Sequence, residues 1–298
     1  MNYSLEVIRL LAVILITFTH TKNDLSTGIT QFVFHELPLL GTVLLSLISG
    51  FLYYKVSKNK NNLLRYKVKT LLIPYLVANV LILGLVLFAY FVFHQNYLQR
   101  LTFDSTLFTE GILALHSPPI NPPTYFIRDL FVVFVCIEMI KNRNTYLFIG
   151  FFLLFLFGKP FLRLDIPLLF LGGLGIAHFS SFIDHYRTKI LLALLGISLC
   201  IWVFQPLTIE ILKFPISLFI FIYIINRNLA FYNVGAYTYL LHLYHVPFIV
   251  VSYPLLNRIV QHPFLNAGLQ IIISLALTYM LFLITRKYKS LRFICGGK

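Results

Sequence analysis

The sequence predicts an all-α fold: a polytopic integral membrane bundle of about ten transmembrane helices. Of its 298 residues, 59% are hydrophobic and only 11% are charged, and the mean hydropathy is +0.85. Soluble domains carry about 25% charged residues, so a chain this apolar cannot cover a water-facing surface. The apolar residues come in runs of about 16 to 22, the length that crosses a bilayer.

Ten apolar runs define the expected helices of one domain, 1–298, with no fused soluble domain. Each run should be helical, because backbone amides left unpaired in lipid are costly. The fifth and sixth runs are short for a span. The runs are Ser4–Thr21, Phe34–Tyr54, Thr70–Phe93, Tyr125–Ile140, Tyr146–Phe157, Ile166–Phe179, Ile190–Phe204, Ile209–Ile225, Val234–Pro254 and Ala267–Arg286.

The basic residues predict that both termini lie in the cytoplasm. Lys and Arg collect in cytoplasmic connections of membrane proteins. With the N-terminus inside, sixteen basic residues fall in the inner connections and the tail, and six fall outside. This distribution accounts for the net charge of +14 without a nucleic-acid partner. The outer six are Lys22, Arg100, Lys159, Arg163, Lys213 and Arg258.

Three ionisable side chains stand in the first run, where each would cost several kcal/mol unless paired or solvated. Glu6 and Arg9 are three residues apart and can form an ion pair. Arg9 and His20 are eleven apart, which in a helix returns to nearly the same face about 16 Å along the axis. We expect this stripe to face the bundle interior or a water-filled cleft. The alternatives are an interfacial ion pair for Glu6 and Arg9, and a polar cap for His20.

Two later runs also carry ionisable groups. Arg128 and Asp129 open the fourth run and, being adjacent, should find separate partners; Asp129 could also simply complement the helix dipole. His242 and His245 lie three residues apart in the ninth run. With no acidic third ligand nearby, a metal is not expected, and a helix–helix hydrogen bond is the alternative for His245.

Two polar connections can be interpreted in two ways each. The basic loop Lys55–Lys69 follows from topology and attraction to anionic lipid, or it forms a cytoplasmic surface for a polyanionic nucleotide donor. The connection Gln95–Thr124 is the longest, is external in this orientation, and contains Pro118-Pro119 and Pro122-Pro123. A loop of this length is usually functional or a flexible spacer.

Five segments, in order along the chain, resemble the large bacterial membrane-bound acyltransferase family three. Arg9, ten intervening residues and His20 resemble the opening helix of that family. The others are Ile48-Ser49-Gly50-Phe51, the basic stretch Lys67 to Tyr75 with its Pro-Tyr ending, Phe126-Ile127-Arg128-Asp129-Leu130, and Tyr239-Leu240-Leu241-His242. Tyr125 stands where tryptophan is usual in the family.

The resemblance implies an O-acyltransferase in the bacterial cytoplasmic (inner) membrane. Its donor would be acyl-coenzyme A, most simply acetyl-coenzyme A, bound from the cytoplasm, and its acceptor a hydroxyl of a cell-surface sugar or polysaccharide. Polysaccharide synthesis machinery would be a natural partner, and neither a permanently bound cofactor nor a metal is implied.

The same resemblance assigns roles to individual side chains. The catalytic residues would be His20, Arg9 and Glu6. His20 would be the general base or acyl relay, Arg9 would neutralise the donor phosphates, for which an arginine fork is suited, and Glu6 would orient Arg9. The remaining substrate-binding candidates are Lys67, Lys69, Tyr75, Arg128, Asp129 and His242.

Two other classes of protein stay open. Buried charges and the proline inside the third run, Pro74, also suit a transporter or flippase for a polysaccharide or a lipid-linked sugar. A structural membrane subunit of a synthase complex would tolerate the loss of Arg9 and His20 together. Consumption of acyl-coenzyme A distinguishes the enzyme from both.

Overall fold

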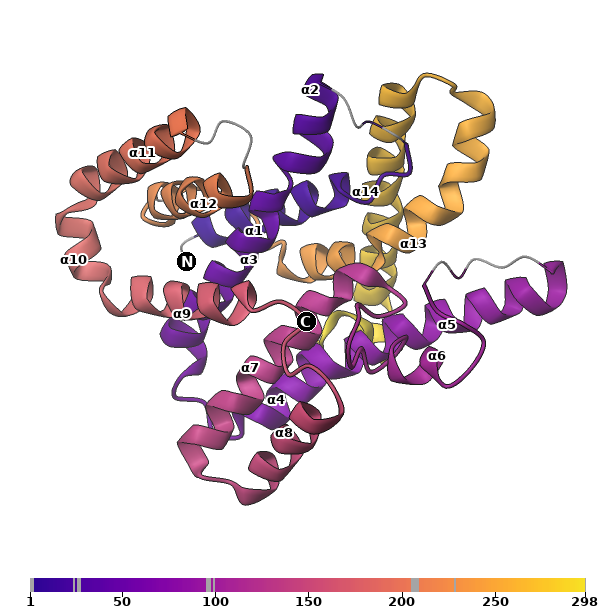
Figure 1. The fold of residues 1–298 in the computed structure, drawn as a ribbon, viewed down its shortest axis with the longest axis horizontal. Coiled ribbons are helices and arrows are strands. Elements are labelled where there is room, and N and C mark those ends of the chain that lie inside the picture. Colours follow the sequence, from indigo (N-terminus) through magenta and orange to yellow (C-terminus); the bar gives the residue numbers. More distant parts are fainter. Residues whose placement is uncertain are drawn as a thin grey trace.

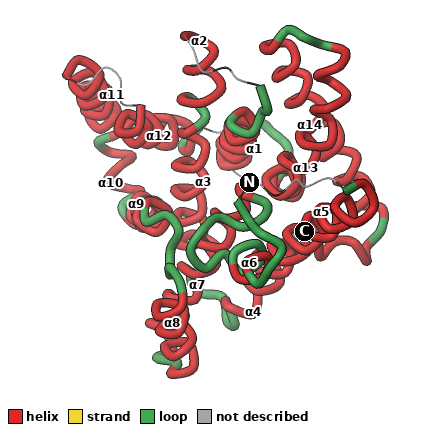
Figure 2. The backbone as a smooth tube through the Cα atoms, turned by 45° about the vertical axis from the view of Figure 1, so that its right-hand side comes forward, coloured by secondary structure: helices red, strands yellow, loops and turns green. Residues whose placement is uncertain are grey.

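The computed structural model describes residues 3–23, 25, 28–94, 98, 100–204, 209–227 and 229–297, and this part of the chain contains no strand (Figures 1 and 2). The α-helices are α1 Ser4–Phe18, α2 Gly28–Gln31, α3 Leu39–Leu52, α4 Leu63–Lys67, α5 Ile73–Phe93, α6 Thr106–Thr109, α7 Tyr125–Asn142, α8 Thr145–Phe157, α9 Asp165–His178, α10 Ser180–His185, α11 Arg187–Phe204, α12 Ile209–Ile225, α13 Gly235–Ile259 and α14 Pro263–Lys287. Three π-helical turns, η1 Phe32–Glu36, η2 Tyr53–Ser57 and η3 Val68–Leu72, extend helices, and η4 Pro122–Thr124 and η5 Lys289–Cys295 are 3-10 helices.

Each of the ten expected runs is largely helical, but five helical segments of the described chain are long and apolar enough to cross a membrane. These five are Gly28–Ser57, Leu63–Val92, Arg187–Phe204, Gly235–Ile259 and Pro263–Lys287. The helices α8 and α9 are apolar but shorter, and α1 has only 15 residues. The bundle is therefore all-helical, with five candidate spans rather than a demonstrated ten.

The helix α3 lies at the centre of the bundle, where it packs against α1, α9 and α12. Two glycines allow α3 and α9 to cross at backbone contact. A Cβ on Gly50 would lie 1.8 Å from the Phe170 carbonyl oxygen, and one on Gly173 would lie 2.0 Å from the Leu47 oxygen. Small residues permit such close helix crossings in membranes. The close crossing at Gly50 therefore fixes the position of the part of α3 where Ile48 and Ser49 line the cavity described below.

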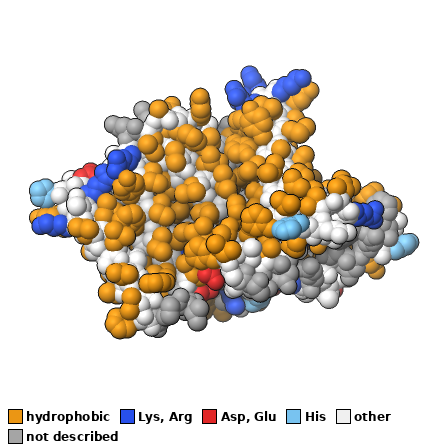
Figure 3. Space-filling model, turned by 90° about the horizontal axis from the view of Figure 1, so that it is seen from above, with side chains coloured by type: hydrophobic (Ala, Val, Ile, Leu, Met, Phe, Trp, Pro, Cys, Tyr) orange, Lys and Arg blue, Asp and Glu red, His pale blue; other side chains and the backbone are white. Residues whose placement is uncertain are grey.

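The outer helices present apolar side chains to their surroundings. Neither α8 nor α11 has a single buried residue, although both are strongly apolar. Hydrophobic atoms cover most of the face in Figure 3, and Lys and Arg gather in small groups at its margins. A soluble monomer rarely exposes so much contiguous apolar surface, whereas a lipid bilayer accommodates it. The molecule has the surface of a membrane protein.

Candidate functional site

The helices α1 and α13 lie side by side (Figure 2), and the contacts between Glu6 and Val234 and between His20 and His245 show that they run in the same direction. At their N-terminal ends, Arg9 Nη1 donates to Glu6 Oε1 at 2.6 Å, and the Val234 amide donates to Glu6 Oε2 at 3.2 Å. At the other end, the rings of His20 and His245 are 5.1 Å apart between centroids. The expected ion pair between Glu6 and Arg9 is present, and it also ties α1 to the start of α13.

A cavity of about 170 Å³ opens between α1, α3, α7 and α13; we call it the Arg9 cavity. Its cationic and imidazole side chains are Arg9, Lys67 and His242. No acidic side chain of the described chain lines it. The remaining lining residues are Val13, Leu45, Ile48, Ser49, Leu52, Tyr53, Ser57, Tyr66, Thr70, Leu71, Phe126, Ile127, Leu130, Phe134, Gly235, Thr238 and Tyr239. The cavity is thus a largely apolar pouch with positive charge on its wall.

Three imidazoles form a row that leads away from this cavity. His242 lines the cavity, is buried, and packs edge-on against Phe126. Its ring centroid is 6.3 Å from that of His245, which in turn contacts His20. We call His242, His245 and His20 the histidine row. His245 was assigned no catalytic role from the sequence, and the signal that could have found it is its three-residue spacing from His242.

The hydrogen bonds of the row leave basic nitrogens available. His245 Nδ1 lies 2.7 Å from the Leu241 carbonyl oxygen, so this nitrogen carries the proton and Nε2 is left as the acceptor. His245 Nε2 and both ring nitrogens of His242 make no hydrogen bond of normal geometry within the described chain, although the Pro123 carbonyl is close to His242. Buried polar atoms without partners are uncommon and point to a functional use.

His20 does not lie on the Arg9 cavity, which corrects the expectation that Arg9 and His20 share one continuous stripe facing one chamber. The reason is local. The α-helix ends at Phe18, and His20 follows in a turn, so the rotation of 100° per residue does not carry through to it. The imidazole on the cavity wall is His242, and His20 reaches the cavity only through His245.

The basic residues Lys67, at the end of α4, and Lys69, in η3, are divided between the cavity and the surface. Lys67 lines the cavity with its ammonium 3.9 Å from the centroid of the Phe134 ring. Lys69 is exposed and does not line it. A separate opening of about 500 Å³, lined by Asn233, Ala236, Phe282, Arg286 and Arg292, lies beside the first turn of α13. The sequence alone assigned these two arginines only to topology.

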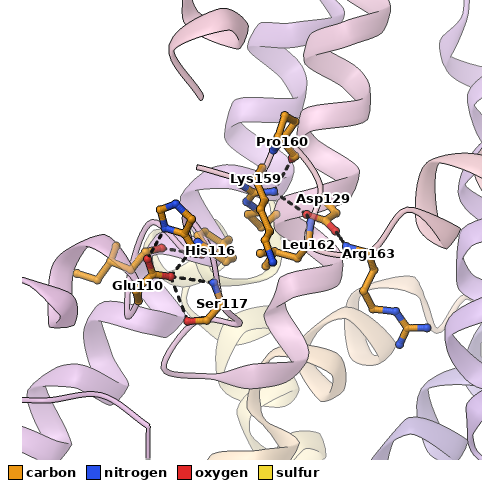
Figure 4. Close-up of polar contacts among 11 residues, drawn as sticks. Glu110, His116, Ser117, Asp129, Lys159, Pro160, Leu162 and Arg163 are labelled. Atoms are coloured by element: carbon orange, nitrogen blue, oxygen red, sulfur yellow. Dashed lines mark hydrogen bonds and ion pairs between the residues drawn. The ribbon is translucent and has the colours of Figure 1, made fainter. Parts of the chain in front are cut away.

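Arg128 and Asp129 hold a loop instead of lining the Arg9 cavity, as Figure 4 shows for Asp129. Asp129 accepts the amide hydrogens of Leu162 and Arg163 at 3.1 and 2.9 Å. Arg128 donates to Asp129 at 2.8 Å and to the carbonyls of Pro160 and Lys159. The adjacent side chains bind one another, contrary to the expectation of separate partners, because both turn to the segment that joins α8 to α9.

Tyr75 anchors the loop between α5 and α7 and likewise lies away from the Arg9 cavity. Its hydroxyl donates to the Ile112 carbonyl at 2.6 Å. One turn later, Asn79 accepts the Asn121 amide at 3.1 Å and donates to the Thr124 hydroxyl at 3.1 Å. These contacts fix the end of the loop to α5. The described part of 95–124 is thus pinned to the bundle, while 95–97 and 99 lie outside the described residues.

A second cavity, also of about 170 Å³, lies where the loop between α5 and α7 meets α5 and α13; we call it the Asn121 cavity. Its polar lining residues are Lys22, Arg100 and Asn121. Lys22 follows His20 by two residues, and the lining residue Val246 directly follows His245. The histidine row therefore lies between the two cavities. The other lining residues are Ile82, Val86, Leu98, Leu101, Ile120, Pro122, Pro247 and Val250.

Within the described residues, no group of three or more His, Cys, Asp or Glu side chains could hold a metal ion. A comparison of the chain with protein-family profiles, with curated proteins and with solved structures finds no match. The geometry of the candidate site consists of two largely apolar cavities, each lined by two cationic side chains, with three neighbouring imidazoles between them.

Proposed function

We propose that the protein is an integral membrane O-acyltransferase that moves an acyl group, most simply acetyl, from acyl-coenzyme A to a hydroxyl of a cell-surface sugar or polysaccharide. In this proposal the chain spans the bacterial cytoplasmic membrane about ten times, with both termini in the cytoplasm. The observation that carries the proposal is the position of the histidine row between the Arg9 cavity and the Asn121 cavity.

The Arg9 cavity suits the donor. Arg9 and Lys67 supply positive charge, and apolar side chains such as Leu45, Ile48 and Phe126 suit the thin pantetheine arm. Phosphates of the donor favour guanidinium groups, whose planar forks bind phosphate oxygens in pairs. Arg286 and Arg292, on the other side of the first turn of α13, extend this basic region toward the cytoplasm. Lys69 is expected to attract the donor phosphates at the same cytoplasmic surface.

The histidine row supplies the base. The acceptor hydroxyl oxygen attacks the thioester carbonyl carbon, the carbon–sulfur bond breaks, and the products are an O-ester and coenzyme A. A histidine of the row takes the hydroxyl proton during the attack and returns it to the departing thiolate. His20 is the proposed base, because it is the partly exposed member of the row and lies two residues from Lys22, which lines the Asn121 cavity. General-base catalysis of this kind contributes about 10²–10⁴-fold.

Arg128, Asp129 and Tyr75 act indirectly in this proposal. They hold the two segments that pack over α7 and α5. Replacing them should therefore lower the stability of the fold, and should lower the rate of acyl transfer only as a consequence. A role in contacting substrate, which the resemblance implied for them, is not needed to explain their contacts.

The proposal is tested with purified protein in nanodiscs and acetyl-coenzyme A labelled in the acetyl group. We expect binding of the donor, and transfer of label to glycan extracted from cells that lack the protein. The Arg9→Gln variant should bind the donor at least about tenfold more weakly. A transporter or a structural subunit would neither consume acetyl-coenzyme A nor release free coenzyme A, and that result would overturn the proposal.

A further inference from the structure

We infer that the Asn121 cavity binds the acceptor and that this acceptor is acidic: a glycan that carries a carboxylate or phosphate group beside the hydroxyl that is acylated. The inference rests on the proposed function and deepens it by naming the class of acceptor.

The charge of the Asn121 cavity supports an anionic ligand. Lys22 and Arg100 both line it, and none of its described lining residues is acidic. No salt bridge joins either cation to a carboxylate in the described chain. Arg100 donates to the Pro118 and Pro119 carbonyls at 3.4 and 3.2 Å, which positions the guanidinium without neutralising its charge. Two cations that have no carboxylate partner among the described residues favour an acid group at this small cavity.

Asn121 lines the same cavity with a side-chain amide that is held in one orientation. The residue is 1% exposed. Its Nδ2 donates to the Leu243 carbonyl at 2.7 Å, which fixes the amide orientation, because only the nitrogen can donate there. Its Oδ1 has no hydrogen-bond partner in the described chain. A buried carbonyl oxygen without a partner is uncommon, and a ligand that donates a hydrogen bond to it would satisfy it.

The rest of the lining and the location suit a sugar. Ile82, Val86, Pro122 and Pro247 offer apolar surface for the C–H faces of a ring, and the volume of about 170 Å³ admits roughly one sugar residue. The cavity adjoins the end of the histidine row remote from the Arg9 cavity. A hydroxyl bound there would approach His20 from the side opposite to the donor.

The test measures binding of two matched probes, a galacturonate hexamer and its neutral methyl ester, to the full chain in phosphatidylcholine nanodiscs by calorimetry. We expect the acidic hexamer to bind at least about tenfold more tightly than the ester. The double variant Lys22→Gln/Arg100→Gln should lose this preference. The matched control Lys159→Gln/Arg258→Gln, which removes the same charge from exposed cations away from the cavity, should keep it.

Two results would overturn the inference: equal binding of the two probes to the wild type, or a preference that survives in Lys22→Gln/Arg100→Gln. Repeating the measurement with phosphatidylglycerol in the nanodiscs distinguishes a lipid headgroup. Loss of the preference there means that a phospholipid phosphate occupies the cavity, which also overturns the glycan assignment.

Binding of acetyl-coenzyme A to the same preparations separates this inference from the proposed function. Donor binding without any acidic preference overturns the acidic acceptor and leaves the transferase. An acidic preference without donor binding overturns the transferase, and with it the assignment of the bound anion as an acceptor.

Discussion

The imidazole rings of His20 and His245 lie 5.1 Å apart between centroids, one just after α1 and the other inside α13. This contact joins the C-terminal end of α1 to the middle of α13, while the hydrogen bond from the Val234 amide to Glu6 joins the N-terminal ends of the two helices. It extends the histidine row from the wall of the Arg9 cavity to the edge of the Asn121 cavity. The proposed chemistry depends on this row.

Replacing His20 with alanine should lower the rate of acyl transfer by about 10²–10⁴-fold, the contribution of a general base. Donor binding should change little, because His20 does not line the Arg9 cavity. The assay measures label transfer at saturating donor, with the protein level in the membrane checked. His262→Ala is the matched control, since His262 is exposed at the start of α14. Transfer at the wild-type rate would exclude His20 as the base.

Replacing Arg9 with lysine should weaken acetyl-coenzyme A binding by roughly tenfold, because an ammonium cannot reproduce a planar fork that serves both Glu6 and a phosphate. Isothermal titration in nanodiscs measures the effect. Arg143→Lys, at an exposed position after α7, should bind like the wild type. Unchanged affinity in Arg9→Lys would mean that a point charge suffices.

Replacing Gly235 with alanine should displace the guanidinium of Arg9. A Cβ at this position would lie 2.9 Å from Arg9 Nη1 and 3.6 Å from Glu6 Oε2. Because Arg9 is a flexible side chain, the helix should survive while the KM for the donor rises by roughly tenfold. Gly268→Ala is the control, since nothing lies within 4 Å of its added Cβ. Equal KM values in the two variants would refute the positioning role of Gly235.

Replacing Asp129 with asparagine should destabilise the fold. The carboxylate is fully buried and accepts two amide hydrogens and one guanidinium hydrogen. Its loss leaves Arg128 as a buried charge without its anion, which costs about 3–5 kcal/mol in buried pairs. The thermal unfolding midpoint in detergent should fall sharply, whereas Asp184→Asn, at an exposed position, should leave it nearly unchanged. A thermal unfolding midpoint equal to that of the wild type would show that Asp129 is not needed for the stability of the fold.

The loop between α5 and α7 should resist acid to an unusual degree. Burial raises the pKa of Glu110, but hydrogen bonds from His116 and Ser117 outweigh it and lower this pKa to about 2 (Figure 4). The ordinary value is 4.5. The carboxylate therefore stabilises the loop fully above pH 4.5, and this stabilisation is lost as the pH falls through about 2.

Amide exchange at His116 and Ser117 measures this effect when wild type and Glu110→Gln are compared at each pH, so that intrinsic exchange cancels. The wild type should keep extra protection down to about pH 3. Protection that disappears near pH 4.5 would show that the carboxylate has an ordinary pKa.

Hydropathy predicted the helices well because the apolar runs are separated by charged or proline-containing connections. Hydropathy could not predict that α1 ends at Phe18, because the polar residues Thr19 and His20 stand where a continuing helix would also place them. It also could not predict the partners of Arg128 and Asp129, which come from a loop more than thirty residues later. Such long-range backbone contacts leave no periodic pattern in the sequence.

The pairing of Glu6 with Arg9 followed from their spacing within one helix turn, and the structure confirms it. The position of His245 in the row did not follow in the same way, because its neighbour His20 comes from a different segment of the chain, far away in the sequence. Lys67 and Lys69 are equally basic in the sequence, yet only Lys67 reaches the Arg9 cavity, since successive helix positions point in different directions.

The most direct test of acyl transfer through the histidine row compares the surface glycans of cells that carry the wild-type protein, His20→Ala, or no protein, by mass spectrometry. The account predicts glycan fragments heavier by one acyl group only with the wild-type protein. Identical glycans in all three cells, or full acylation with His20→Ala, would contradict it.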